Sequence, residues 1–70
     1  MPDYDTMINM LDRAGIIYST DWNRETLLGS EKRVVKWIII PNRIHGIELG
    51  TYLKFNIAGG LESIAALTNN

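Results

Sequence analysis

The sequence predicts an α+β domain in which an N-terminal helix packs on an antiparallel sheet of three or four strands. Three observations lead to this prediction. Apolar residues recur at helical spacing near the start of the chain, β-branched and aromatic residues alternate with polar ones in the rest, and turns rich in glycine, proline or asparagine separate the segments. The 70 residues are expected to form a single domain. A chain of this length buries only about 60% of its surface on folding, so its core is thin.

A helix is expected from about Asp3 to Ala14. Its apolar residues share one stripe of the helix surface, namely Tyr4, Met7, Ile8, Leu11 and Ala14. Asp3 is suited to the N-cap position, because its carboxylate can accept a bond from a free backbone N–H. Gly15 can take the left-handed conformation that ends a helix, and Ile16 then folds back on Leu11.

The segment from Ile16 to Trp22 predicts a first strand, since it is rich in β-branched and aromatic residues. Asn23 to Glu31 is expected to be a loop or a long hairpin connection. A second strand is expected from Lys32 to Ile40, ended by Pro41, which cannot donate to a ladder. Its two faces carry Val35, Trp37 and Ile39 on one side and Val34, Lys36, Ile38 and Ile40 on the other.

The second half continues with a loop from Pro41 to Gly46, a third strand from Ile47 to Phe55 and a hairpin turn from Asn56 to Gly60. Two possibilities stay open for the tail from Leu61 to Leu67. Its residues have good helix propensity, whereas the two glycines that follow an alternating strand favour a return strand. The strand is preferred.

The helix is expected to pack on the sheet face that carries Trp37. The predicted core is Met7, Ile8, Leu11, Val35, Trp37, Ile39, Leu49, Leu53 and Phe55. Residues 37–40 are all large and apolar, so both faces of the second strand need a cover. Only one convincing helix can be read in the sequence, which leaves the second face without a layer.

The second face is therefore the candidate protein interface. It is expected to carry Val34, Lys36, Ile38, Ile40, Tyr52 and Lys54, an apolar patch edged by two lysines. Two interpretations stay open. The patch contacts another protein molecule, or the loop from Asn23 to Ser30 folds over it and buries Leu27 and Leu28.

Composition favours contact with a second copy. Small domains obtain extra stability from disulfides, metals or oligomerisation, and this chain has no cysteine. The net charge is −3 over residues 1–25 and +3 over residues 31–55, and opposite charges of this kind settle against each other within one chain or between two. No apolar stretch reaches the ~20 residues that cross a bilayer, so a cytoplasmic protein without a membrane partner is expected.

The sequence carries no pattern typical of catalysis, and no catalytic, cofactor-binding or metal-binding residue is assigned. His45 is the only histidine, and no carboxylate lies nearer to it in sequence than Glu48. As a general base it would need a positioned partner and a pocket. Asp3, Asp5 and Asp12 lack the dense oxygen ligands and the central glycine of a calcium loop. A non-enzymatic protein is therefore expected.

Two segments carry a resemblance to a known group. Residues 11–18 read Leu-Asp-Arg-Ala-Gly-Ile-Ile-Tyr, and residues 55–64 read Phe-Asn-Ile-Ala-Gly-Gly-Leu-Glu-Ser-Ile. With the apolar strand between them, they resemble small uncharacterised bacteriophage and prophage proteins. In that group a helix ends in Ala-Gly-Ile and a meander of strands ends in a Phe-Asp-x-x-Gly-x-Leu hairpin; here Asn56 replaces the aspartate and the turn has an additional glycine. The resemblance implies the fold, a C-terminal strand and a phage or prophage setting, with the host cytoplasm as location. It implies no activity.

The leading functional hypothesis is a non-enzymatic interaction module of phage or prophage type that forms a homodimer. A second hypothesis is an inhibitor that presents the same patch to a host enzyme or defence protein. A third is a small nucleic-acid-binding protein, suggested by Trp37 and Tyr52 near the basic residues Lys32, Arg33, Lys36 and Lys54. The sequence pI of about 5.6 disfavours the third.

Overall fold

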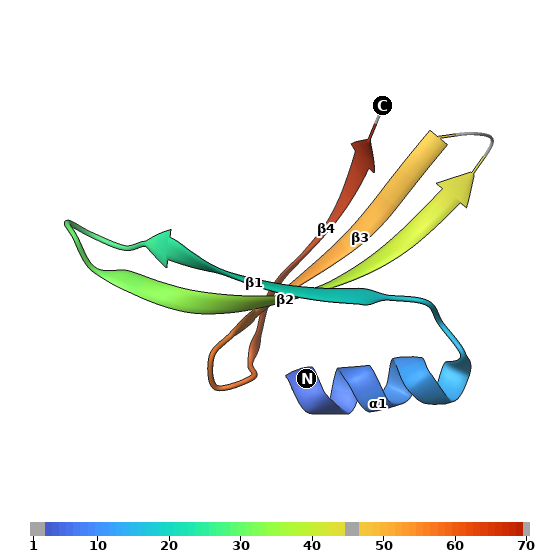
Figure 1. Ribbon diagram of the computed structural model, residues 1–70, viewed down its shortest axis with the longest axis horizontal. Coiled ribbons are helices and arrows are strands. Elements are labelled where there is room, and N and C mark those ends of the chain that lie inside the picture. Colours follow the sequence, from blue (N-terminus) through green and yellow to red (C-terminus); the bar gives the residue numbers. More distant parts are fainter. Residues whose placement is uncertain (1–2, 45–46, 70) are drawn as a thin grey trace.

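The computed structural model describes residues 3–44 and 47–69, with the side chains of residues 3–41 and 50–66. Within these residues it has a helix, α1 (Tyr4–Ala14), and the strands β1 (Ser19–Thr26), β2 (Lys32–Ile44), β3 (Ile47–Asn56) and β4 (Leu61–Asn69). The strands form an antiparallel sheet in the order β1-β2-β3-β4. Figure 1 shows α1 on one side of this strongly twisted sheet. The predicted α+β fold with an N-terminal helix is confirmed.

The ends of α1 follow the sequence prediction closely. The carboxylate of Asp3 accepts a bond from the Thr6 N–H at 2.8 Å, as an N-cap does. At the other end Gly15 has a φ of 68°, in the left-handed region that glycine adopts without strain. The N–H of Ile16 donates to the carbonyl of Leu11 at 3.0 Å, which is the long bond of a Schellman motif.

The core lies between α1 and the sheet. Its buried members are Leu11, Ile38, Leu53 and Phe55, and the half-buried residues packed against them are Tyr4, Met7, Ile8, Tyr18, Ile40 and Leu61. The ring of Tyr4 meets that of Phe55 edge to face, with 5.3 Å between the centroids. The Tyr4 N–H also donates to the Gly59 carbonyl in the turn between β3 and β4, which fastens the start of α1 to the sheet.

The first hairpin differs from the prediction. β1 runs from Ser19 to Thr26 instead of from Ile16 to Trp22, so the first half of the expected loop from Asn23 to Ser30 is strand. Residues 23–26 pair with residues 32–35 of β2, and the short turn that remains is closed by the Leu27 N–H donating to the Glu31 carbonyl at 2.7 Å. Cross-strand pairing at Glu25 and Arg33 outweighs the turn propensity of this segment. The loop therefore does not cover the sheet.

Two further strand predictions meet different outcomes. β2 continues through Pro41 to Ile44, whereas the sequence predicted its end at Ile40. The pairing of β1 with β2 ends at Ser19, which lies opposite Ile39. Pro41 therefore has no β1 neighbour, and its missing N–H is tolerated on that side of β2. The tail forms the strand β4, which resolves the choice between strand and helix in favour of the strand.

The predicted face for helix packing was wrong. Ile38 lies opposite Leu53, and the face that these two residues share is the one under α1. Trp37 and Ile39, predicted to be core, lie on the other face because side chains alternate along β2. Lys36 shares the covered face, and its ammonium group sits 4.9 Å from the centroid of the Tyr4 ring. The predicted core residue Leu49 lies outside the side chains described.

Candidate protein interface

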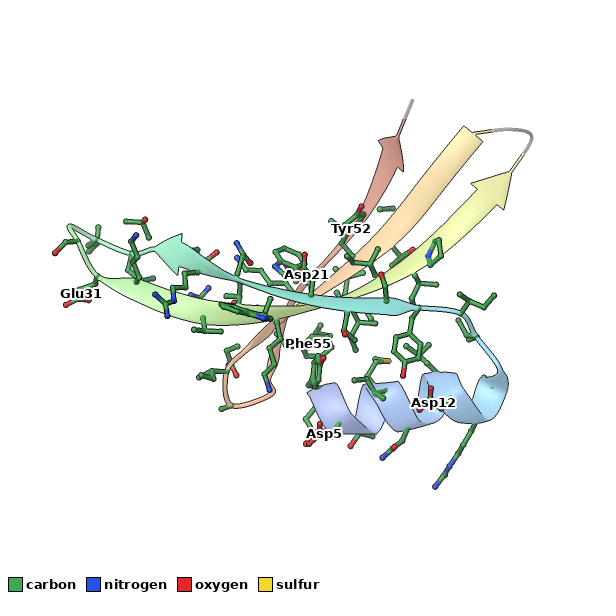
Figure 2. All side chains as sticks on the ribbon, viewed as in Figure 1. Asp5, Asp12, Asp21, Glu31, Tyr52 and Phe55 are labelled. Atoms are coloured by element: carbon green, nitrogen blue, oxygen red, sulfur yellow. The ribbon has the colours of Figure 1, made fainter. Side chains whose placement is uncertain are left out.

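The face of the sheet opposite α1, here called the open face, is the strongest candidate site. Figure 2 shows Phe55 between the sheet and α1 and Tyr52 on the other side of the sheet. In the part of the chain that the structure describes, no helix or strand lies over the open face.

An apolar patch occupies one half of the open face. We call Trp37, Ile39, Tyr52 and Ala65 the open-face patch; they line a shallow hollow of about 460 Å³ together with Asp21, Asn23 and Ser63. Tyr52 lies opposite Ile39 on β2 and opposite Ala65 on β4. Its ring meets that of Trp37 edge to face, with the centroids 6.4 Å apart. Three neighbouring strands thus contribute to one apolar surface.

Trp37 is fixed in place from two sides. Its indole N–H donates to the side-chain oxygen of Asn23 on β1 at 2.7 Å, so its polar atom is already satisfied. The ammonium group of Lys54 lies 5.7 Å from the centroid of the indole ring, within the range of a cation–π contact. The patch is therefore preorganised, which lowers the entropy cost of binding a partner.

A chain of ion pairs occupies the other half of the open face. Glu25 accepts from the Arg33 Nε at 2.7 Å and from the Lys54 Nζ at 2.6 Å. The guanidinium group of Arg33 also donates hydrogen bonds to both carboxylate oxygens of Glu62, at 2.5 and 2.8 Å. Glu62 lies at the irregular position in the register between β3 and β4, where a bulge can redirect a side chain. We call Glu25, Arg33, Lys54 and Glu62 the ionic cluster.

The ionic cluster closes its half of the open face with the chain's own side chains. Lys54 lies opposite Trp37, and Glu25 lies opposite Arg33, so the bond between Lys54 and Glu25 crosses β2 at Val35. Val35 is 0% exposed although α1 lies on the other face. The ionic cluster therefore covers Val35, whereas the open-face patch has no such cover.

The ionic cluster also shifts the pKa values of two of its members, Glu25 and Arg33. Hydrogen bonds from Lys54 and then from Arg33 hold the pKa of the Glu25 carboxyl below its usual value. Hydrogen bonds to Glu62 and then to Glu25 raise the pKa of the Arg33 guanidinium further above its already high value. Glu25 and Arg33 are therefore charged at neutral pH, and each of the four groups lies beside a group of opposite charge.

The six predicted interface residues fall on two different faces. Ile38 is part of the core and Ile40 packs against it, so neither belongs to an uncovered surface. Val34 and Lys36 lie on the same face of the sheet as Ile38, beside the start of α1, where they border a hollow next to Tyr4. Tyr52 and Lys54 lie on the open face. The sequence prediction of one patch made by all six residues was therefore wrong in its placement.

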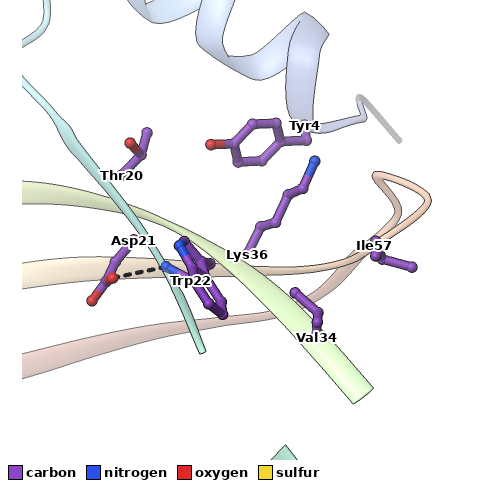
Figure 3. A pocket seen from close by; sticks show the side chains of 7 residues that line it. All are labelled: Tyr4, Thr20, Asp21, Trp22, Val34, Lys36 and Ile57. Atoms are coloured by element: carbon purple, nitrogen blue, oxygen red, sulfur yellow. Dashed lines mark hydrogen bonds between the residues drawn. The ribbon is translucent and has the colours of Figure 1, made fainter. Parts of the chain in front are cut away.

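A second hollow, the helix-side groove, lies on the covered face beside the start of α1 (Figure 3). It has a volume of about 410 Å³ and is lined by Tyr4, Thr20, Asp21, Trp22, Val34, Lys36 and Ile57. Trp22 is 61% exposed and Ile57 is 67% exposed, so its apolar walls stand largely in solvent. Because both protrude rather than pack, this groove is less preorganised than the open-face patch.

Sequence reasoning missed Trp37 and Ile39 as surface residues, although the signal to find them was present. Once Leu53 and Phe55 are assigned to the core, the residues opposite them on β2 must share their face. The observed register places Ile38 and Lys36 there. The segment Pro41 to Gly46 was interpreted as a loop, so no register was available, and a shift of one residue exchanges the two faces.

Within the residues that the structure describes, no group of three or more His, Cys, Asp or Glu side chains could hold a metal ion. His45 lies outside the described residues. No helix in the described ranges is long and apolar enough to span a membrane.

Comparisons with known proteins provide no relative. No family model, no curated protein and no solved structure matches this chain. The open-face patch and the ionic cluster must therefore be interpreted from their own geometry.

Proposed function

We propose that this chain is a non-enzymatic interaction module that self-associates through the open face of its sheet. The observation that carries the proposal is the open-face patch, in which a half-buried Trp37, Ile39 and Tyr52 lie side by side without a covering layer. A clustered apolar surface of this kind, with polar residues at its rim, is typical of a protein contact. The phage or prophage setting stays a prediction from the resemblance.

The charges of the open face favour a second copy of this chain as the occupant. The ionic cluster pairs its acidic and basic groups internally. Two copies can therefore approach face to face without opposing large charges of one sign, whereas a strongly charged partner would find no matching field.

The thin core gives the same contact an energetic reason. Among the described residues, the fully or nearly fully buried hydrophobic side chains are Leu11, Val35, Ile38, Leu53 and Phe55. A core of this size rarely supplies more than about 3 to 5 kcal/mol, and association of two open faces adds buried apolar area. Self-association thus stabilises the fold and creates the interface at the same time.

The test is the solution mass, measured by light scattering behind size exclusion on three proteins. The wild type is expected to be self-associated. Ile39→Glu places a charge in the middle of the open-face patch and is expected to lower the mass while far-UV circular dichroism stays unchanged. Leu28→Glu is the matched control, because Leu28 is 91% exposed in the turn between β1 and β2.

The outcomes separate this function from the inhibitor hypothesis. A wild type that is monomeric at all concentrations contradicts self-association and leaves the patch free for a host protein, as an inhibitor requires. A self-associated protein whose mass is unaffected by Ile39→Glu contradicts the use of the open face. An equal loss of mass in Leu28→Glu would show that the added charge, not the position, matters.

A small nucleic-acid binder is the second candidate, because Trp37, Tyr52 and Lys54 lie together on the open face. Exposed aromatic side chains on a sheet stack on bases in several binding modules. Lys54 is engaged with Glu25, however, and Lys36 lies on the opposite face, so the two lysines cannot hold one phosphate backbone. Binding of single-stranded oligonucleotides that weakens with salt and is lost in Trp37→Ala would support this candidate.

A further inference from the structure

The two edges of the sheet are built differently. β1, at one edge, carries Asp21, Arg24 and Glu25, and charged side chains on an edge strand discourage pairing with another chain. The N–H of Trp22 in β1 also donates to the carboxylate of Asp21 at 2.8 Å, so one backbone group of this strand already has a partner. The β1 edge is thus protected by its own side chains.

β4, at the other edge, has no comparable protection. From Ser63 to Asn69 it contains no charged residue and no proline, which are the usual means of blocking an edge. Ile64 is 62% exposed, and Ala65 and Ala66 are exposed as well. Every second residue of an edge strand directs its N–H and C=O outward, where only water or another strand can satisfy them.

We infer that β4 is a second contact between copies of this chain, in which the β4 strands of two molecules pair antiparallel and join their sheets. The partner has to be an extended strand, because the surface offered is a row of backbone donors and acceptors. A second β4 suits this row because the segment from Ser63 to Asn69 is uncharged. When it pairs with itself about a two-fold axis, no like charges face each other.

The pleat fixes a register for this pairing. Ala66 is the central residue of the uncharged segment, so a two-fold axis at Ala66 places this residue opposite its own copy. Residues 65 and 67 then lie opposite each other, as do residues 64 and 68, and each pair belongs to one face of the sheet. The open faces of both copies end on the same side of the joined sheet.

Two different two-fold contacts on one chain generate a closed tetramer with three two-fold axes when their axes intersect at right angles, and an axis normal to the joined sheet can meet an axis parallel to the stacked open faces in this way. One contact is the pairing of β4 with β4, and the other is the stacking of open faces. The tetramer, unlike the β4 contact itself, rests on the proposed function. The expected mass of the wild type is four times the 7.9 kDa of a single chain.

The test compares Ala66→Lys with Thr20→Lys. Ala66 and Thr20 are both exposed residues of edge strands, and both lie on the covered face of the sheet. Thr20 pairs with Ile38 of β2. Ala66 pairs with Thr51 of β3, which in turn pairs with Ile40 of β2, on the same face as Ile38. Lysine at Ala66 brings two ammonium groups together at the two-fold axis and is expected to halve the mass. Thr20→Lys, at the β1 edge, is expected to keep the wild-type mass. Circular dichroism establishes that all variants are folded.

Hydrogen exchange supplies a readout that a change in folding alone would not give. The outward-facing amides of β4 are expected to exchange more slowly in the wild type than in Ala66→Lys, while the amides of β2 stay equally protected in both. Equal masses of the wild type and Ala66→Lys, with equal exchange in β4, would overturn the β4 contact.

The same measurements separate the β4 contact from the open-face contact. A wild-type dimer that only Ile39→Glu dissociates overturns the β4 contact and leaves the proposed function standing. A wild-type dimer that only Ala66→Lys dissociates supports the β4 contact and overturns association by the open face. A monomeric wild type overturns both.

Discussion

The apolar residues on the two faces of this sheet are covered in different ways. Ile38 and Ile39 are neighbours in β2, yet Ile38 is 0% exposed under α1 and Ile39 is half-buried on the open face. One face is covered by a helix. The other is covered in one half by the ionic cluster, above Val35, and is left open in the other half. A small chain can thus close most of a two-sided sheet with a single helix and a cluster of ion pairs, and the uncovered remainder is the surface that we propose for association.

The largest expected effect comes from comparing two aromatic residues of β3 that point to opposite faces. Phe55→Ala removes a fully buried ring from the core and should cost about 3 to 5 kcal/mol of unfolding free energy, close to the whole stability of a domain this small. Tyr52→Ala removes a half-buried ring from the open face and should cost the isolated chain less. Urea unfolding monitored by circular dichroism measures both.

Protein concentration sharpens this comparison. The unfolding midpoint of the wild type is expected to rise with concentration, and Tyr52→Ala should lose most of that dependence because it weakens association. If Phe55→Ala has no folded baseline, Phe55→Leu keeps most of the volume and retains a measurable transition. A larger loss of stability in Tyr52→Ala than in Phe55→Ala would contradict the assignment of the faces.

A smaller effect is expected from removing one methyl group on each face. Ile38→Val should lower the free energy of unfolding by about 0.5 to 1.5 kcal/mol, because the methyl group leaves a small void in a closed core. Ile39→Val should stay within about 0.5 kcal/mol when measured at low concentration, where the open face is in water. Equal losses would mean that both faces are closed in the single chain.

The parts of the fold that could be predicted from the sequence are those decided locally. The stripe of apolar residues, the N-cap at Asp3 and the stop at Gly15 are all set within one short segment, and α1 is found there. The turn from Asn56 to Gly60 and the strand after it were likewise readable, because Gly59 provides the positive φ of 100° that the turn requires.

The parts that could not be predicted depend on pairing between distant segments. The extension of β1 to Thr26 comes from its partner strand and not from its own turn-rich sequence. The choice of covered face depends on the register that joins Ile38 to Leu53. Lys36 was expected to edge an open patch, yet its ammonium group rests on the Tyr4 ring of α1 on the covered face. Polarity along one strand does not reveal such a local solution.

The smallest expected effect concerns acid, and it tests whether the ionic cluster contributes to closing the open face. The pKa of Glu25 is lower in the folded chain than in the unfolded one, because Lys54 and Arg33 stabilise its charged form. Its contribution to stability is therefore complete above its usual pKa of 4.5 and is lost as the pH falls through the lowered folded pKa. The effect is modest, since the ionic cluster is in contact with solvent.

Glu25→Gln should therefore unfold at a lower temperature than the wild type at neutral pH, and the two melting curves should approach each other as acid protonates Glu25. Glu31→Gln removes the same charge from the exposed turn between β1 and β2, and its melting temperature should follow that of the wild type at every pH. High salt should reduce the difference between Glu25→Gln and the wild type at neutral pH. A difference in melting temperature that stays constant from neutral to acid pH would mean that the introduced amide disturbs the packing over Val35. The charges of the ionic cluster would then add nothing to stability, and the two halves of the open face would be less distinct than their geometry indicates.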